Sequence, residues 1–236
     1  MRGPRTLPRV PRRLSTGRVE LGAVFLLVAG CATRARVAGP RPASQGGQGT
    51  APDGTSLTHE GKALLGAGKP AAALAAFQRA LEVDAAPALR QDDLRVAARL
   101  NNVGAAMVAL GSPAEALVYF RRSFAIDEMV LDKAHPDLAI RLNNIGVALH
   151  ALGRPSEALA YYRWALAVDE EAPGTAHPDV AIRLGNIAVA LQSLGKSGEA
   201  VAYFQRARAI AHRTLVVTGL DSVKAPAKLT RTWIDR

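Results

Sequence analysis

The sequence predicts an all-α solenoid of about four two-helix units. Residues 135–170 and 177–210 share most of their sequence, and related residues return every 42 positions. A period of about 20–50 residues indicates a solenoid, in which each unit buries its apolar face against its neighbours. No stretch shows the period-two alternation of a half-buried strand. Five columns are identical in three units: Arg99, Arg141 and Arg183; Leu100, Leu142 and Leu184; Asn102, Asn144 and Asn186; Gly111, Gly153 and Gly195; and Glu115, Glu157 and Glu199.

The unit at residues 135–170 is expected to contain two amphipathic helices. Apolar residues recur at helical spacing over residues 137–152. Gly153 ends this helix, because glycine accepts the positive φ of a helix end. Pro155 opens the second helix, and Glu157 lies near its positive N-terminal end. Small residues let the two helices approach closely and large ones fill the remaining space. The small residues are Gly146, Ala158 and Ala165, and the large ones are Leu142, Tyr162 and Leu166.

This order of large and small residues resembles the tetratricopeptide repeat. The matching residues are Leu142, Ile145, Gly146, Leu149, Ala158, Tyr162 and Ala165 in one unit; Leu100, Val103, Gly104, Met107, Ala116 and Phe120 in the unit before it; and Leu184, Ile187, Ala188, Leu191, Ala200, Phe204 and Ala207 in the unit after it. A degenerate first unit, offset by 43 positions rather than 42, matches at Leu57, Gly61, Leu64, Gly68, Ala73, Phe77 and Ala80. The length of the period, the HPD start and the LNN run resemble the kinesin light chain subtype.

The resemblance implies a right-handed solenoid whose first helices line a concave groove. It divides residues 56–213 into four units, at about 56–90, 91–132, 133–174 and 175–213. The second helix of the last unit is expected to end near residue 213, which leaves residues 214–236 as a C-terminal cap or tail. Solenoids need a terminal cap over their last apolar face, which favours a capping helix. A mobile tail or a dimer contact remains the alternative.

Residues 1–30 have the layout of a bacterial lipoprotein signal peptide. Six arginines precede a short apolar run, Leu21 to Ala29, which is too short to span a membrane as a helix. The run ends in VAGC at residues 28–31. This ending resembles the lipobox, so Cys31 is expected to carry lipid after cleavage. The alternative is an ordinary Cys31 in an uncleaved anchor.

The expected location is the periplasmic side of a bacterial membrane. Residues 31–55 would form a flexible linker, because their Gly, Pro, Ser and Gln cannot bury a core. Ala32 follows the cysteine, and aspartate at that position retains enterobacterial lipoproteins in the inner membrane. The outer membrane is therefore favoured.

Net charge does not predict a nucleic-acid partner. The formal charge of +10 suggests one at first. Residues 1–30, however, hold six arginines and one glutamate, so half of the excess lies in the proposed signal. Export also separates the protein from cytoplasmic nucleic acid. We expect no nucleic-acid partner.

Neither catalysis nor a bound cofactor is expected. No nucleophile arrangement, phosphate loop or nucleotide fingerprint occurs in the sequence. His135 and His177, in two HPD runs, stand one full repeat apart and gather no local set of metal ligands. Proline and aspartate in these runs are explained by helix capping.

Asparagines and arginines of the first helices are the candidate groove residues. Asparagine offers two donors and two acceptor sites, so it can bind a peptide backbone. Arginines three residues earlier lie one turn away on the same face, where they can pair with acidic groups of a partner. The alternatives are bonds to neighbouring helices or water for the asparagines, and solvated charges or salt bridges with acids of the next unit for the arginines. The candidate set is Asn101, Asn102, Asn143, Asn144, Asn186, Arg99, Arg141, Arg183, His150 and Gln192.

The sequence therefore predicts a membrane-anchored adaptor or assembly factor of the bacterial envelope. It would bind a protein partner, as a peptide or a helix, in the concave groove. The alternative is a structural subunit that packs into an envelope complex through its convex face or its C-terminal end. The oligomeric state does not follow from the sequence.

Overall fold

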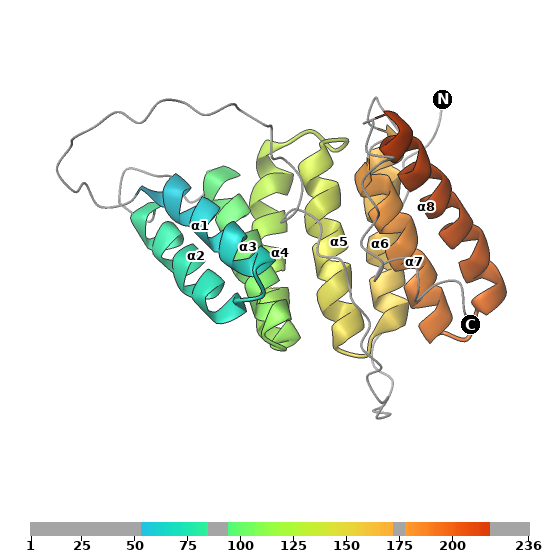
Figure 1. The fold of residues 1–236 in the computed structure, drawn as a ribbon, viewed down its shortest axis with the longest axis horizontal. Coiled ribbons are helices and arrows are strands. Elements are labelled where there is room, and N and C mark those ends of the chain that lie inside the picture. Colours follow the sequence, from blue (N-terminus) through green and yellow to red (C-terminus); the bar gives the residue numbers. More distant parts are fainter. Residues whose placement is uncertain (1–52, 85–93, 172–177, 218–236) are drawn as a thin grey trace.

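A computed structural model describes residues 53–84, 94–171 and 178–217, and these residues form eight α-helices (Figure 1). The predicted all-α solenoid of about four units is confirmed. The helices are α1 (Gly54–Gly66), α2 (Pro70–Asp84), α3 (Leu94–Ala109), α4 (Pro113–Val130), α5 (Pro136–Ala151), α6 (Pro155–Glu171), α7 (Pro178–Ser193) and α8 (Ser197–Val217).

The helices stack in sequence order, and each packs against the one before it (Figure 1). Each unit is an antiparallel pair: α1 with α2, α3 with α4, α5 with α6, and α7 with α8. Helix α8 continues to Val217, four residues beyond the predicted end. No glycine or proline interrupts the sequence between Gly198 and Gly219, which allows this continuation. The predicted signal and most of the predicted linker and C-terminal segment lie outside the described residues.

A glycine with positive φ ends the first helix of every unit. Gly153 has φ 72°, and its N–H donates to the carbonyl of His150 at 2.9 Å. The next N–H, of Arg154, donates to the carbonyl of Leu149 at 2.9 Å. These two bonds form a Schellman motif, which satisfies carbonyls that a helix end leaves open. The same pair of bonds recurs at Gly68, Gly111 and Gly195.

Within a unit, an aromatic ring packs directly on the backbone of the first helix. A Cβ atom placed on Gly146 would lie 2.5 Å from Cε1 of Tyr162, and one on Gly104 would lie 2.6 Å from Cε1 of Phe120. Gly61 and Phe77 make the same contact in the first unit, so the degenerate unit repeats the packing of the others. In the last unit, Ala188 replaces the glycine, and Phe204 on the second helix is only half-buried.

The main core is continuous from the first unit to the last. It contains the three buried rings together with aliphatic residues of α2 to α8. Tyr162 differs from the two phenylalanines in carrying a hydroxyl, which is buried and has no hydrogen-bond partner among the described residues. Burial therefore raises the pKa of the Tyr162 phenol.

We predict that Gly146→Ala will lower the free energy of unfolding by about 1–3 kcal/mol, because the added methyl group would overlap the Tyr162 ring. Urea titration of the full chain, followed by circular dichroism, measures this loss. Gly185→Ala is the matched control, since its Cβ would meet nothing within 4 Å. It should be neutral or stabilising by up to about 1 kcal/mol, because alanine favours helix. Equal effects of the two substitutions would contradict the packing.

Candidate functional site

The first helices form the inner row of the solenoid. Helix α3 packs directly on α1 and α5, and α5 packs on α7, whereas no such packing joins α2, α4, α6 and α8 to one another within the described residues. In a curved stack, the more closely spaced row lies on the concave side. Helices α1, α3, α5 and α7 therefore line the concave face.

Four asparagines form one chain of hydrogen bonds along this row. Asn186 of α7 donates from Nδ2 to Oδ1 of Asn143 at 2.9 Å. Asn143 donates to Oδ1 of Asn144, its neighbour on α5, at 3.4 Å. Asn144 then donates to Oδ1 of Asn101 on α3 at 2.8 Å. The amides all donate in one direction, from the last unit toward the second.

All five candidate asparagines are buried. Their geometry agrees with the alternative interpretation of the sequence, in which asparagines of this row bond to neighbouring helices. Asn143 and Asn144 are 0% exposed, and Asn101, Asn102 and Asn186 are at most 5% exposed. The amides of the four bonded residues, Asn101, Asn143, Asn144 and Asn186, hold adjacent first helices together. Direct contact between these asparagines and a partner stays a prediction.

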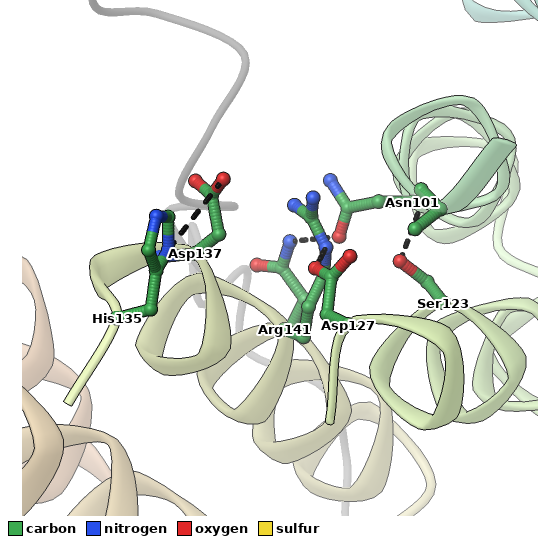
Figure 2. Close-up of polar contacts among 8 residues, drawn as sticks. Asn101, Ser123, Asp127, His135, Asp137 and Arg141 are labelled. Carbon is green, nitrogen blue, oxygen red and sulfur yellow. Dashed lines mark hydrogen bonds and ion pairs between the residues drawn. The ribbon is translucent and has the colours of Figure 1, made fainter. Parts of the chain in front are cut away.

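Two of the three arginines also join consecutive units through buried ion pairs. Nε of Arg141 lies 2.8 Å from Oδ2 of Asp127, and Nε of Arg183 lies 2.6 Å from Oδ2 of Asp169. Figure 2 shows the first pair beside Asn101. Both aspartates lie in the last turn of the second helix of the preceding unit. The sequence had suggested acids of the next unit as the partners. They also lie one repeat apart, in a column not singled out from the sequence.

Burial dominates the electrostatics of these pairs. It raises the pKa of the Asp127 carboxyl, although the Arg141 charge acts in the opposite direction. It likewise lowers the pKa of the Arg183 guanidinium, against the attraction of Asp169. Such a pair is expensive to split, because either partner alone would be an uncompensated buried charge.

Arg99 has a different environment because it joins the degenerate first unit to the second. Its Nη1 donates to the carbonyl of Ala80 at 2.7 Å, and it is 5% exposed. Its guanidinium packs against the backbone at Gly54, where an added Cβ would lie 2.6 Å from Nη2. Arg99 therefore reaches both helices of the first unit.

Side chains that reach solvent on the inner face are mostly aliphatic, and sequence reasoning missed the aliphatic ones. They share two columns, one with Ala98, Ile140 and Ile182 and one with Val108, His150 and Gln192, together with Val189. Residues 182, 189 and 192 follow the i, i+7, i+10 spacing of one helix face.

His150 and Gln192, which were predicted for the groove, lie near the C-terminal ends of α5 and α7. Nε2 of His150 lies 3.1 Å from Oγ of Ser193. Burial lowers the pKa of the His150 imidazole, so the neutral ring is favoured. Gln192 is exposed.

The first HPD run caps a helix. Nδ1 of His135 accepts a hydrogen bond from the N–H of Asp137 at 3.2 Å, at the start of α5. Figure 2 shows the separate contact between the His135 ring and the Asp137 carboxylate, at 3.8 Å. His177 lies outside the described residues. Over the described ranges, no three His, Cys, Asp or Glu side chains come together as a metal site.

Family comparisons agree with the geometry of the helix pairs. Two sequence profiles, each described as tetratricopeptide repeat, match residues 95–171 and 180–217. This is a tetratricopeptide repeat protein. The matches begin after the first helix pair, so the assignment of the first repeat rests on its packing in the structure. Tetratricopeptide repeats are scaffolds for protein–protein interaction. No curated protein matches the chain.

Solved structures share the fold. The nearly identical TPR-like repeats of a Podosopora anserina protein described as a kinesin light chain align with TM-score 0.56 and 22% identity over 68% of this chain and 76% of that one. BtubC (BKLC) from P. vanneervenii aligns with TM-score 0.60 and 20% identity over 68% of this chain and 64% of that one. Aspartyl phosphate phosphatase F from Bacillus subtilis gives TM-score 0.58 and 17% identity over 68% and 40%. At these identities the likeness concerns the fold alone.

Membrane attachment is not tested by the fold. Cys31 and the proposed signal lie outside the described residues. Among the helices that the structure describes, none has the length and apolar character needed to cross a bilayer.

We predict that Asp127→Asn will destabilise the protein by about 3–5 kcal/mol, because it leaves the buried Arg141 charge uncompensated. The free energy of unfolding in urea is the measurement. Glu170→Gln provides the control. It also removes the acid of an ion pair between units, Glu170–Arg206, but both side chains of that pair are at least half exposed. Its cost should not exceed about 1 kcal/mol. If Asp127→Asn lowered the free energy of unfolding by no more than Glu170→Gln does, the buried pair would not be what holds the units together.

Proposed function

We propose that the protein is a membrane-anchored adaptor or assembly factor of the bacterial envelope, which binds a peptide or helix of a protein partner along its concave face. The row of first helices supports this proposal most directly. It presents related side chains from three consecutive repeats on one face. A continuous surface of this kind suits a ligand that extends over several repeats.

An amphipathic helix fits the inner face better than an extended peptide. The asparagine amides already bond one another, which leaves fewer groups for a peptide backbone. Half-buried aliphatic residues, such as Ile140, Ile182 and Val189, instead offer apolar contact. Apolar side chains at i, i+3, i+4 and i+7 of a partner helix would pack on such a surface.

The membrane anchor is supported by the N-terminal sequence. Six arginines, a short apolar run and the VAGC of residues 28–31 follow the order of a lipoprotein signal. Lipid on Cys31 would place the repeats on the periplasmic side of a membrane, with the outer membrane favoured. Residues 32–55 would give a reach of roughly 25–30 Å, at about 5–6 Å × √n.

Groove binding predicts that Ile182→Glu combined with Val189→Glu will abolish capture of the partner. Two carboxylates would oppose burial of an apolar helix face. The experiment is affinity capture of the full chain from detergent-solubilised membranes of the native host, with wild type and variant compared by quantitative mass spectrometry. Substitution of the asparagines is less informative, because their burial makes the fold sensitive to it.

Val201→Glu is the matched control for groove binding. Val201 is 52% exposed on α8, a second helix. A partner lost in the double variant and kept in the control supports the groove. A partner lost only in the control favours the alternative, a structural subunit that packs through its outer face or C-terminal end.

Lipidation predicts that Cys31→Ser will release the protein from membranes. Without the thiol, no acyl chain can be attached, and each buried CH₂ group otherwise contributes about 0.8 kcal/mol of membrane affinity. Labelled palmitate incorporation and membrane fractionation in a bacterial host measure the two effects. Ser44→Ala, in the proposed linker, is the control. Wild type that incorporates no label would contradict lipidation, and membrane attachment that survives Cys31→Ser would contradict the lipid on Cys31 as the anchor.

A further inference from the structure

The outer face of the solenoid carries a row of exposed arginines. Arg79 on α2, Arg121 and Arg122 on α4, and Arg163 on α6 are exposed. Within the described residues none of these four forms an ion pair, whereas Arg154 pairs with Glu157 and Arg206 with Glu170.

The four side chains recur with the repeat. Arg121 and Arg163 are separated by one repeat period, and Arg79 and Arg122 by one position more, which is the offset of the first unit. Each pair therefore occupies one position on successive second helices. We call the four residues the arginine stripe.

An aromatic cluster lies on α4 and α6, the helices that also carry three arginines of the stripe. The ring of Trp164 on α6 meets that of Phe124 on α4 edge to face, with centroids 5.5 Å apart. Tyr161 stacks against Trp164 at 6.4 Å. The inner sides of the three rings pack on the core cluster around Leu142, and all three residues remain partly accessible. The cluster bridges the outer sides of two consecutive repeats.

We propose that the arginine stripe and the aromatic cluster bind an acidic segment of a protein partner that also carries apolar side chains. Arginine pairs with carboxylates through two parallel hydrogen bonds, which are stronger than those between neutral groups. Tryptophan and tyrosine supply large, rigid contact areas and dominate many protein interfaces. This site lies on the second helices, so it is separate from the concave face of the proposed function.

A narrow acidic ligand suits this face better than a membrane or a nucleic acid. Glu115 and Glu128 lie one to two turns from the arginines on α4, and Glu170 and Glu171 lie near the end of α6. A broad anionic surface would be repelled by these carboxylates, whereas a single segment can follow the stripe. The described residues are also nearly balanced, with 16 Lys and Arg against 15 Asp and Glu, so they produce little general attraction for polyanions.

The length of the ligand follows from the helix spacing. The stripe crosses from α2 to α6, which is two steps, each wider than the roughly 10 Å between directly packed helices, because the second helices do not pack on one another within the described residues. An extended chain covers about 3.3 Å per residue, so a segment longer than about six residues is needed to span it. A suitable probe is a fluorescent peptide of about ten residues, composed of glutamate with phenylalanine at every third position.

The test is fluorescence anisotropy of this peptide with the full chain in non-ionic detergent. Wild type should bind it, with affinity that falls as salt is raised. Arg121→Gln, Arg122→Gln and Arg163→Gln together should weaken binding by about tenfold or more. A matched control removes three exposed charges elsewhere, by Lys69→Gln, Lys133→Gln and Lys196→Gln, and should retain the affinity. Ile182→Glu with Val189→Glu should also retain it, which separates this site from the groove.

Three results would overturn the proposal. The first is no binding of the peptide by wild type at about millimolar concentration. The second is equal weakening in the arginine and lysine variants, which would indicate general electrostatic attraction. The third is binding of phosphatidylglycerol vesicles, but not of the peptide, that is lost in the arginine variant. That result would assign the stripe to a lipid surface.

Discussion

Each of the first three units of the solenoid depends on contact between an aromatic ring and the backbone of the preceding helix. Gly104 and Gly146 leave no Cβ atom in the way, so Phe120 and Tyr162 lie flush against their partner helices and are 0% exposed. This contact sets the distance within each pair. It thereby fixes the positions from which side chains reach the next unit, including the arginines and asparagines of the first helices.

Polar contacts between units fix how neighbouring helices are aligned along their axes, which apolar packing alone does not do. Aliphatic surfaces tolerate small shifts, but a shift of one turn would separate Arg183 from Asp169 and leave two buried charges unpaired. The Arg141–Asp127 pair places the same constraint on the preceding junction. The outer surface follows this register, since Phe124 meets Trp164 across the junction that the Arg141 pair holds.

The repeat made the fold predictable, but it concealed the pairing of the asparagines. The sequence period aligns Asn102, Asn144 and Asn186, and columns of this kind are readable from the sequence. The hydrogen bonds instead join residues one position further apart, Asn101 with Asn144 and Asn143 with Asn186, because they run diagonally between neighbouring helices. Nor does periodicity reveal which large apolar side chains stay partly exposed, as Ile182 and Trp164 do. Their accessibility depends on the curvature of the stack.

The directional amide chain has a mechanical consequence. The two central amides, of Asn143 and Asn144, both donate and accept, so consecutive bonds polarise one another, and weakening one weakens its neighbours. Bending at the α3–α5 junction or at the α5–α7 junction is therefore resisted by the hydrogen bonds of both junctions. We expect the second, third and fourth repeats to bend as one unit. The junction between the first and second repeats lies outside this row of amides, and Arg99 supplies its hydrogen bond to Ala80. We therefore expect this junction to be the most compliant one among the described repeats.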